Sequence, residues 1–144
     1  MQETVAKTPE KRLTKIDFNC DAAQVFGFST TKNEDQILDY ISSVSIATGF
    51  HAGDPVSIKK AIQKAKERNI SIGAHIGFND LQGFGNRPMN LSDDELESLV
   101  IYQVGALMTF AKACGAEVEY VRPHGAMYKM ASEDFSFSCA IARA

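Results

Sequence analysis

Three histidines, His51, His75 and His124, are the residues of this sequence whose type and spacing best suit shared chemistry. Each follows or closes a short apolar run with the pattern of a β-strand, and Asp21 holds the equivalent place after the first such run. Because the carboxyl ends of parallel strands meet at one rim of an α/β fold, these four side chains are expected to converge. A single histidine there is more often a hydrogen-bonded loop residue, but three of three predict a shared site.

Two chemistries suit an aspartate and three imidazoles at one rim. Such a set can hold Zn²⁺ or a similar ion with an open position for water. It can also carry out general acid–base work on a bound amide without a metal. The sequence has no HExxH or CxxC pattern that would mark a local metal site, so both alternatives stay open.

Glycines and charged residues near the histidines extend the candidate site. Gly53 and Asp54 follow the first histidine, and glycines there allow a positive φ or the close approach of a ligand. Gly83, Gly85 and Arg87 can clamp an anionic group, although an ordinary surface loop explains the same pattern and no GxxxxGK phosphate loop is present.

Two further polar side chains belong to the candidate set. Gln103 falls on the apolar stripe of a predicted helix, seven residues after Leu96, so it is expected to hydrogen-bond inward. Tyr128 is either a wall of the site or an aromatic residue of the core or rim.

Short apolar runs that alternate with helical stretches must position these residues. Asp54-Pro55 predicts one helix start, Ser92 with Glu95 predicts another, and Gly115 predicts the end of the second helix. Four βα units in series imply a parallel sheet, open or barrel-like, with right-handed crossovers. The expected strands are 16–20, 44–47, 70–74 and 118–121, and the expected helical stretches are 34–41, one from 55, one after 92, and 133–143, with a long loop over 77–90.

The length of 144 residues suits one domain and falls well short of the roughly 250 residues of a complete (β/α)₈ barrel. With 44% hydrophobic residues, the chain is expected to bury a core. The polar residues 1–13 are expected to form a flexible extension, and residues 14–144 the domain.

The charge balance of 15 basic and 18 acidic residues gives a net charge of −3, which makes no electrostatic case for nucleic acid or an anionic membrane surface. No apolar run approaches the roughly 20 residues of a membrane helix. The three cysteines are odd in number and far apart, which fits reduced thiols and predicts a cytoplasmic protein.

Six sequence blocks occur in an order that is highly specific. They are Asn19-Cys20-Asp21, GFHAGDP at 49–55, GAH at 73–75, DLQGFG at 80–85, YQVGAL at 102–107 and PHGAMY at 123–128. Through them, residues 14–142 resemble the LamB/YcsF family of 5-oxoprolinase A subunits.

This resemblance implies a deacetylase-like (β/α) barrel of the TIM type, truncated so that only about the first four βα units are present. It implies the opening of 5-oxoproline to glutamate with B and C partner subunits, and ATP as co-substrate together with Mg²⁺. Asp21, His51, His75 and His124 take the catalytic positions, and the first three can form a divalent-metal site by analogy with deacetylases. The implied substrate-binding residues are Asn19, Gly53, Asp54, Gly83, Gly85, Arg87, Gln103, Arg122 and Tyr128.

The chain also departs from the family pattern. Gln24 stands where the family has a carboxylate and cannot act as a base, and Arg122 replaces a lysine. Two alternatives therefore stand beside the oxoprolinase hypothesis. One is a metal-dependent, deacetylase-like hydrolase. The other is a truncated, inactive interaction module, whose exposed strand edges favour pairing with another chain, including a second copy.

Overall fold

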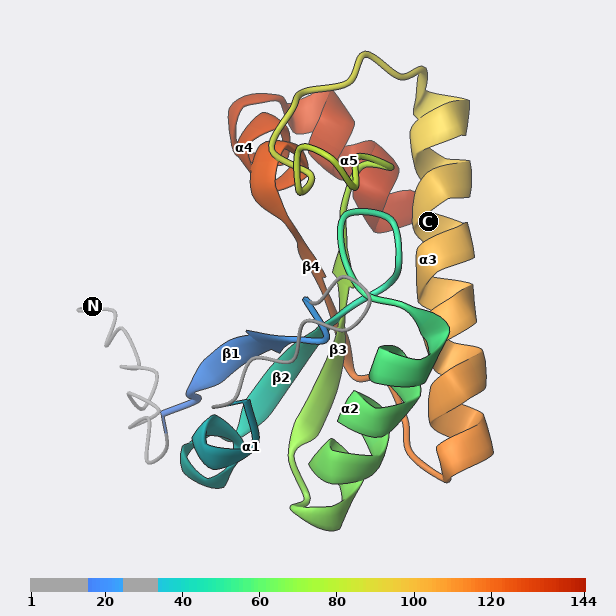
Figure 1. The fold of residues 1–144 in the computed structure, drawn as a ribbon. Coiled ribbons are helices and arrows are strands. Elements are labelled where there is room, and N and C mark those ends of the chain that lie inside the picture. The colour runs from blue at the N-terminus through green and yellow to red at the C-terminus, as the bar shows by residue number, and fades with distance from the viewer. Residues whose placement is uncertain (1–15, 25–33) are drawn as a thin grey trace, which may run out of the picture.

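Four parallel strands form the sheet of the computed structural model, which describes residues 16–24 and 34–144. The strands are β1 (Asn19–Ala22), β2 (Ser43–Ala47), β3 (Ser71–Ile76) and β4 (Tyr120–Pro123), and they lie side by side in chain order (Figure 1). Each pairing is parallel, so every connection crosses over the sheet. The predicted parallel α/β sheet is confirmed.

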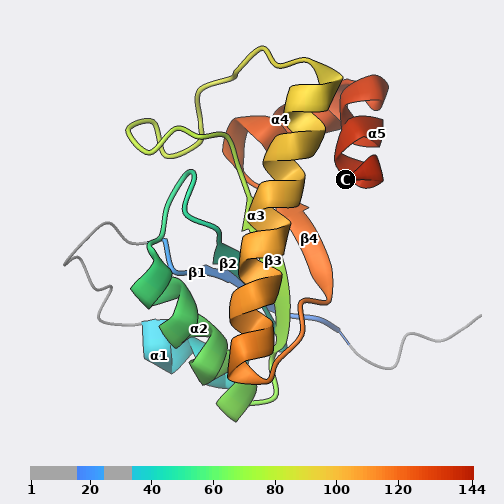
Figure 2. The same cartoon turned by 90° about the vertical axis from the view of Figure 1, so that its right-hand side faces the viewer.

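Two long helices, α2 (Pro55–Glu67) and α3 (Asp93–Cys114), cover one face of this sheet (Figures 1 and 2). The predicted start signals are confirmed: the Asp54 carboxylate accepts from the first-turn amides of α2, and Ser92 forms a capping box with Glu95 at α3. Gly115 ends α3 in the left-handed conformation with φ 68°. Local signals thus set the start of both covering helices and the end of α3.

The core lies between the sheet and these helices. Alternate residues of the central strands point toward α2 and α3. Each of these helices packs an apolar face against them. The largest contributors are Val44, Ile46, Ile72, Ile76, Ile58, Ile62, Leu96, Val100 and Leu107.

The opposite face of the sheet is polar. Residues paired in register share a face, and one such row runs across all four strands through Asp21, Ser45, Gly73 and Tyr120. A carbon at the Cβ position of Gly73 would lie 2.1 Å from the Tyr120 ring, so the glycine makes room for that ring. The phenol then reaches across the sheet to Asn19 Nδ2, which donates to it over 2.6 Å. This row supplies the floor of the candidate site.

The strand at the start of the sheet lies further along the chain than predicted. The expected strand 16–20 is replaced by β1. Residues 17 and 18 bond to the residues at the start of β2 through a side chain and one backbone carbonyl, and they do not form the regular backbone hydrogen bonds of a strand. Asp17 accepts from the hydroxyls of Ser42 and Ser43, and the Phe18 carbonyl accepts from both of their amides. Asp21 consequently lies within β1, not after it.

The helical stretches at both ends also differ from prediction. The expected helix 34–41 is one α turn, α1 (Glu34–Ile37), followed by a 3₁₀ turn, η1 (Leu38–Tyr40). The expected helix 133–143 corresponds to α5 (Phe135–Arg143), whereas α4 (Gly125–Glu133), which precedes it, was not predicted. Asp134 separates them, because its extended backbone ends α4 while its carboxylate accepts from Phe137 N and starts α5.

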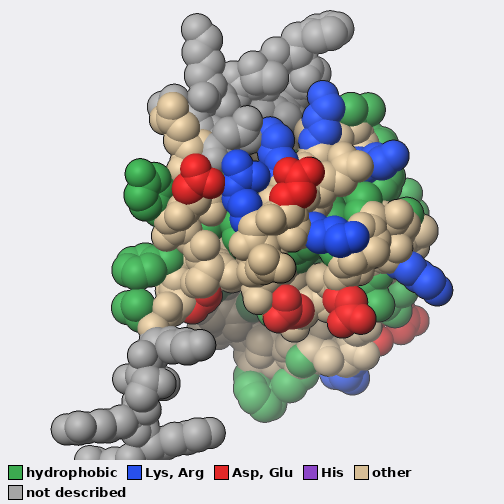
Figure 3. Space-filling view, turned by 90° about the horizontal axis from the view of Figure 1, so that it is seen from below, with side chains coloured by type: hydrophobic (Ala, Val, Ile, Leu, Met, Phe, Trp, Pro, Cys, Tyr) green, Lys and Arg blue, Asp and Glu red, His purple; other side chains and the backbone are tan. Residues whose placement is uncertain are grey.

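The predicted extension over residues 1–13 lies outside the described residues. Among the described residues, no helix combines the length and the apolarity that crossing a membrane would require. The amino-terminal end of the sheet presents mixed acidic and basic side chains (Figure 3), among them the Arg68–Asp39 ion pair. This end therefore shows no surface of a single charge sign.

Candidate functional site

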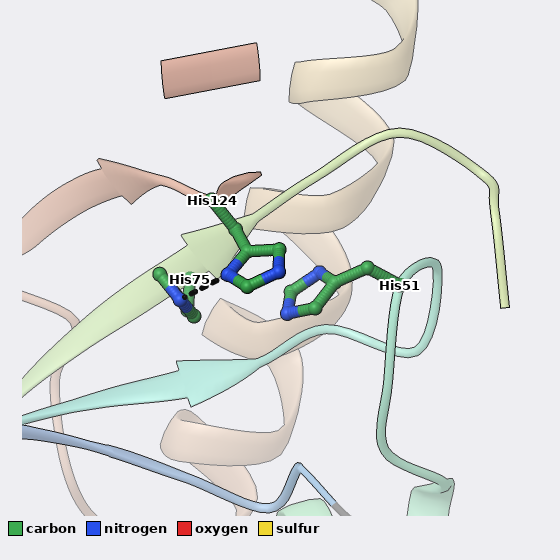
Figure 4. A group of neighbouring side chains, drawn as sticks. All are labelled: His51, His75 and His124. Carbon is green, nitrogen blue, oxygen red and sulfur yellow. Dashed lines mark hydrogen bonds between the residues drawn. The ribbon is translucent and has the colours of Figure 1, made fainter. Parts of the chain in front are cut away.

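The three histidines converge at the carboxyl end of the sheet. His51 lies in the loop between β2 and α2, His75 lies within β3, and His124 directly follows β4 at the N-cap of α4 (Figure 4). One ring nitrogen from each lies within 4.8 Å of the others. The His51 and His124 rings stack with centroids 4.1 Å apart, and His75 meets both edge-on. The topological expectation placed His75 after its strand, and the structure puts it inside.

Backbone carbonyls fix the outward-facing nitrogens of two of these rings. His75 Nδ1 lies 3.0 Å from the Arg122 carbonyl, and His124 Nε2 lies 2.8 Å from the Phe84 carbonyl. A carbonyl oxygen only accepts, so both nitrogens carry their proton. In the neutral rings, the lone pairs of His75 Nε2 and His124 Nδ1 then face each other over 3.0 Å. Two facing lone pairs repel, so this geometry calls for a shared proton or a cation between them.

His51 differs from the other two histidines in its hydrogen bonding. Its side chain is fully buried, and neither ring nitrogen has a hydrogen-bond partner among the described residues. Burial, followed by the neighbouring His124 and His75, lowers the pKa of His51 to about 3. The ring is neutral at ordinary pH, and it keeps a lone pair for a ligand.

Asp21 and Arg122 border the histidines on the polar face of the sheet. Asp21 Oδ2 lies 3.4 Å from His75 Nε2, and its Oδ1 accepts from Arg122 Nη1 over 2.6 Å. When His75 Nε2 carries a proton, its hydrogen bond to Asp21 lowers the pKa of that carboxyl below its usual value, and the charges of His75 and Arg122 add to this effect. Arg122 Nη1 also donates to Asn19 Oδ1. Three predicted site residues therefore join the cluster as one ionised, hydrogen-bonded patch.

Gln103 lies beneath the site and not on its open face. The side chain is fully buried, its Oε1 accepts from Gly77 N and from the Thr48 hydroxyl, and its Nε2 donates to Leu99 O. The inward hydrogen bonding predicted for it is seen. Because both its amide oxygen and its amide nitrogen are engaged, Gln103 holds the ends of β2 and β3 together and does not face substrate.

Replacing Gln103 with leucine is expected to destabilise the fold by about 1–3 kcal/mol, because Gly77 N–H and the Thr48 hydroxyl lose their buried acceptor. Urea unfolding followed by circular dichroism measures the change. The matched control is Thr109→Ala, which removes an exposed hydroxyl bond on the same helix. Equal effects of the two substitutions would show that the buried amide has no special role.

The glycine loop between β3 and α3 is closed by an ion pair. Arg87 pairs with the buried Asp80 carboxylate, which also accepts from Gly83 N over 2.9 Å. A Cβ on Gly83 would lie 2.2 Å from Asp80 Oδ2. Arg87 is thus committed within the described loop, while Gly85 packs against His51 and His124, where a Cβ would approach within 3 Å of each.

Acid is expected to weaken this loop closure. The bond to Arg87 lowers the pKa of Asp80 from 3.8 to about 2, so the carboxylate's contribution is complete above about pH 4 and disappears as the pH falls toward 2. The unfolding free-energy difference between the unchanged protein and Asp80→Asn should therefore shrink over that interval. A difference that stays constant between about pH 5 and pH 2 would contradict the ion-pair account.

The remaining predicted residues lie at the borders of the cluster. Asp54 caps α2 with its carboxylate. Gly53 has φ 88°, and a Cβ there would come within 2.9 Å of Ala23 O, so it serves the turn that carries the first histidine. Tyr128 is 59% exposed on α4. The structure does not bring these side chains into the histidine cluster.

Several participants were not among the predicted site residues. The Phe84 carbonyl sets the orientation of His124, Thr48 bonds to Gln103, and Tyr120 supports Asn19. A main-chain acceptor has no residue-type signature. Tyr120 had one signal, a glycine at the facing position of the neighbouring strand, but only once the register was known.

The donor set fits a divalent cation on structural grounds. Two neutral rings aim lone pairs at the same space, and a third buried ring lacks partners among the described residues. Imidazole nitrogens suit Zn²⁺ and related ions. His51, His75 and His124 would hold such an ion, with Asp21 beside them, whereas the predicted set had Asp21 in place of His124.

Parallel strands with a polar site at their carboxyl rim define an α/β protein of the (β/α) barrel type. Comparison with known proteins agrees with this class. The chain belongs to the LamB/YcsF family, whose model matches residues 16–144.

Named relatives are similar over nearly all of the chain. A 5-oxoprolinase A subunit from Bacillus cereus is 48% identical over 132 residues, 92% of this chain and 52% of that protein. The corresponding protein of Bacillus mycoides is equally similar. The crystal structure of the lactam utilization protein from Thermus thermophilus matches with a TM-score of 0.84 at 43% identity, over 90% of this chain and 52% of that one. The chain thus spans about half the length of these relatives.

Proposed function

We propose that this chain carries the A-subunit site of an ATP-dependent 5-oxoprolinase, which opens 5-oxoproline to glutamate together with B and C subunits. The observation that carries the proposal is the convergence of His51, His75 and His124 beside the ionised Asp21. Family membership and the names of the relatives support the lactam as substrate. The three cysteines, all free thiols, and the need for ATP fit a cytoplasmic setting.

The polar face offers groups suited to an anionic lactam. Arg122 is about half exposed, and its bonds to Asp21 and Asn19 use only Nη1 among the described residues. Its other N–H groups can bind the substrate carboxylate. In this scheme, ATP with Mg²⁺ activates the amide by phosphorylation, and the rim residues bind and orient the activated ring.

Proton transfer in the proposed reaction falls to the histidine pair. His75 Nε2 and His124 Nδ1 face the same space, and neither position is blocked by a bond to the backbone. One ring can take a proton from the attacking water while the other donates one to the nitrogen that leaves the ring. Asp21 Oδ2 lies 3.4 Å from His75 Nε2, where it can accept a hydrogen bond from that nitrogen during the transfer.

The test is ATP-dependent glutamate release from 5-oxoproline by the purified chain combined with B and C subunits of a relative. Turnover that needs ATP and is lost in a His51→Ala, His124→Ala double variant would support the proposal. Full activity of that double variant would overturn the site assignment, and release without ATP would overturn the reaction.

A second function, metal-dependent hydrolysis of an amide or acetylated substrate, is favoured by the facing lone pairs of His75 and His124. A bound Zn²⁺ would supply Lewis acidity and an acidified water. Equilibrium dialysis tests this: about one Zn²⁺ per chain should bind, and the stoichiometry should fall to zero in His75→Ala. No uptake by the unchanged chain would exclude this function.

A further inference from the structure

The side-chain amide of Asn19 is fully engaged by neighbouring strands. Its Nδ2 donates to the Ser43 hydroxyl over 2.8 Å and to the Tyr120 hydroxyl over 2.6 Å. Its Oδ1 accepts from the Ser45 hydroxyl and from Arg122 Nη1, each over 3.0 Å. Two amide hydrogens and two oxygen lone pairs are the whole capacity of an asparagine side chain. These bonds point to a role for Asn19 in holding its neighbours in place.

Three of these groups form a closed ring of hydrogen bonds on the polar face of the sheet. Ser45 donates its hydroxyl hydrogen to Asn19 Oδ1, so in the 3.4 Å contact between Ser45 Oγ and Tyr120 Oη the phenol is the donor. Asn19 Nδ2 closes the ring by donating to the phenol oxygen. Each member donates one bond and accepts one, and such chains strengthen their members. The ring sets the orientation of the amide, with Oδ1 toward Arg122, whose guanidinium only donates.

We propose that Tyr120, acting through Asn19, is a positioning residue that holds Arg122 for the carboxylate of a lactam substrate. This inference rests on the proposed function, in which Arg122 binds that carboxylate. Tyr120 lies two residues before Arg122 on the same face of β4, as Asn19 does before Asp21 on β1. Arg122 Nη1 donates to Asn19 Oδ1 over 3.0 Å and to Asp21 Oδ1 over 2.6 Å. Both hydrogens of Nη1 are then used, and the carboxylate meets the other guanidinium nitrogens.

Gly73 makes the position of the Tyr120 ring possible. The ring extends from β4 across β3, and a Cβ at Gly73 would lie 2.1 Å from it. The φ of Gly73 lies outside the left-handed region, and the three atoms nearest to its Cβ position all belong to this ring. Gly73→Ala should therefore displace the phenol from Asn19 without straining the backbone. It gives a second way to break the ring of hydrogen bonds, with the Tyr120 hydroxyl still present.

Equilibrium binding of two lactams tests the proposal. 5-Oxoproline and 2-pyrrolidinone share the lactam ring, and the first adds a carboxylate. Titration calorimetry should show that the unchanged chain prefers 5-oxoproline. Arg122→Gln should reduce this preference by about 10–100-fold, and Tyr120→Phe and Gly73→Ala should each reduce it by about 3–10-fold. The matched control is Tyr40→Phe, which removes the hydroxyl of an 81% exposed tyrosine and should leave the preference unchanged.

A double-mutant cycle separates positioning from a general effect on the fold. In an Arg122→Gln background, Tyr120→Phe should change the preference no further, because it acts through Arg122. Three results would overturn the proposal: equal affinity of the unchanged chain for both lactams, full preference in Tyr120→Phe, or an effect of Tyr120→Phe that persists in the Arg122→Gln background. None of these needs turnover, so they are distinguishable from a lack of ATP-dependent glutamate release, which would overturn the proposed reaction.

Discussion

Replacing His75 with alanine is expected to lower ATP-dependent glutamate release by about 10²–10⁴-fold, the usual contribution of a positioned acid or base. His75 is the residue that joins the site together. Its Nε2 lies 3.0 Å from His124 Nδ1 and 3.4 Å from Asp21 Oδ2, and its other nitrogen is bound to the Arg122 carbonyl. Its loss leaves Asp21 without its histidine partner. Steady-state assays of the reconstituted enzyme measure the effect.

The comparison needs a folded variant and a neutral control. His75→Gln keeps most of the side-chain volume but lacks an imidazole, so it should be nearly as inactive while unfolding close to the unchanged protein. Tyr40→Ala removes a side chain that is 81% exposed before β2, at the opposite end of the sheet, and should keep full activity. A rate close to that of the unchanged protein for His75→Gln would remove this residue from the chemistry.

Gly125→Ala is expected to destabilise the protein by about 2–5 kcal/mol through backbone strain and overpacking. Gly125 has φ 52°, and a Cβ there would lie 2.6 Å from the Gly85 carbonyl oxygen. The same carbonyl accepts from Ala126 N, so the loop cannot move away without losing that bond. A fall in melting temperature of roughly 5–15 °C should follow, measurable by circular dichroism.

The control for Gly125→Ala is a glycine substitution that is expected to raise the stability of the protein. Gly105 is in the middle of α3 and has nothing within 4 Å of its Cβ position, so Gly105→Ala should stabilise the helix by about 0.5–1 kcal/mol. The two alanine variants together separate a steric clash from the general effect of removing a glycine. Equal melting temperatures for both would show that the Gly85–Gly125 contact does not limit stability.

Local signals explain which parts of the fold were predictable. The Asp54 and Ser92 caps and the left-handed Gly115 are decided within a few residues, so the start of α2 and both ends of α3 followed from the sequence. The start of β1 depends on where β2 offers partners, which no local pattern contains. The helix α4 was not predicted, whereas α5 agrees with the expected helix 133–143 to within two residues at its start.

The candidate site likewise has features that the sequence predicted and features that it did not. The convergence of the histidines follows from strand order alone, because parallel strands bring their carboxyl ends together. The roles of Arg87 and Gln103 do not, since each is decided by partners that only the folded chain brings within reach: the buried Asp80 for one, and Thr48 with Gly77 for the other. Periodicity placed Gln103 inward without saying what it would meet.

The strand order of this sheet, β1-β2-β3-β4, has a kinetic consequence. Each strand joins an edge already formed by its predecessor, so the sheet can grow one unit at a time as the chain leaves the ribosome. His51 and His75 come into place with β2 and β3, but His124 arrives only after β4 has docked. The 3.0 Å contact between His75 and His124 therefore needs β4 in place, and the imidazole signals of this pair would report the docking of β4 on β3.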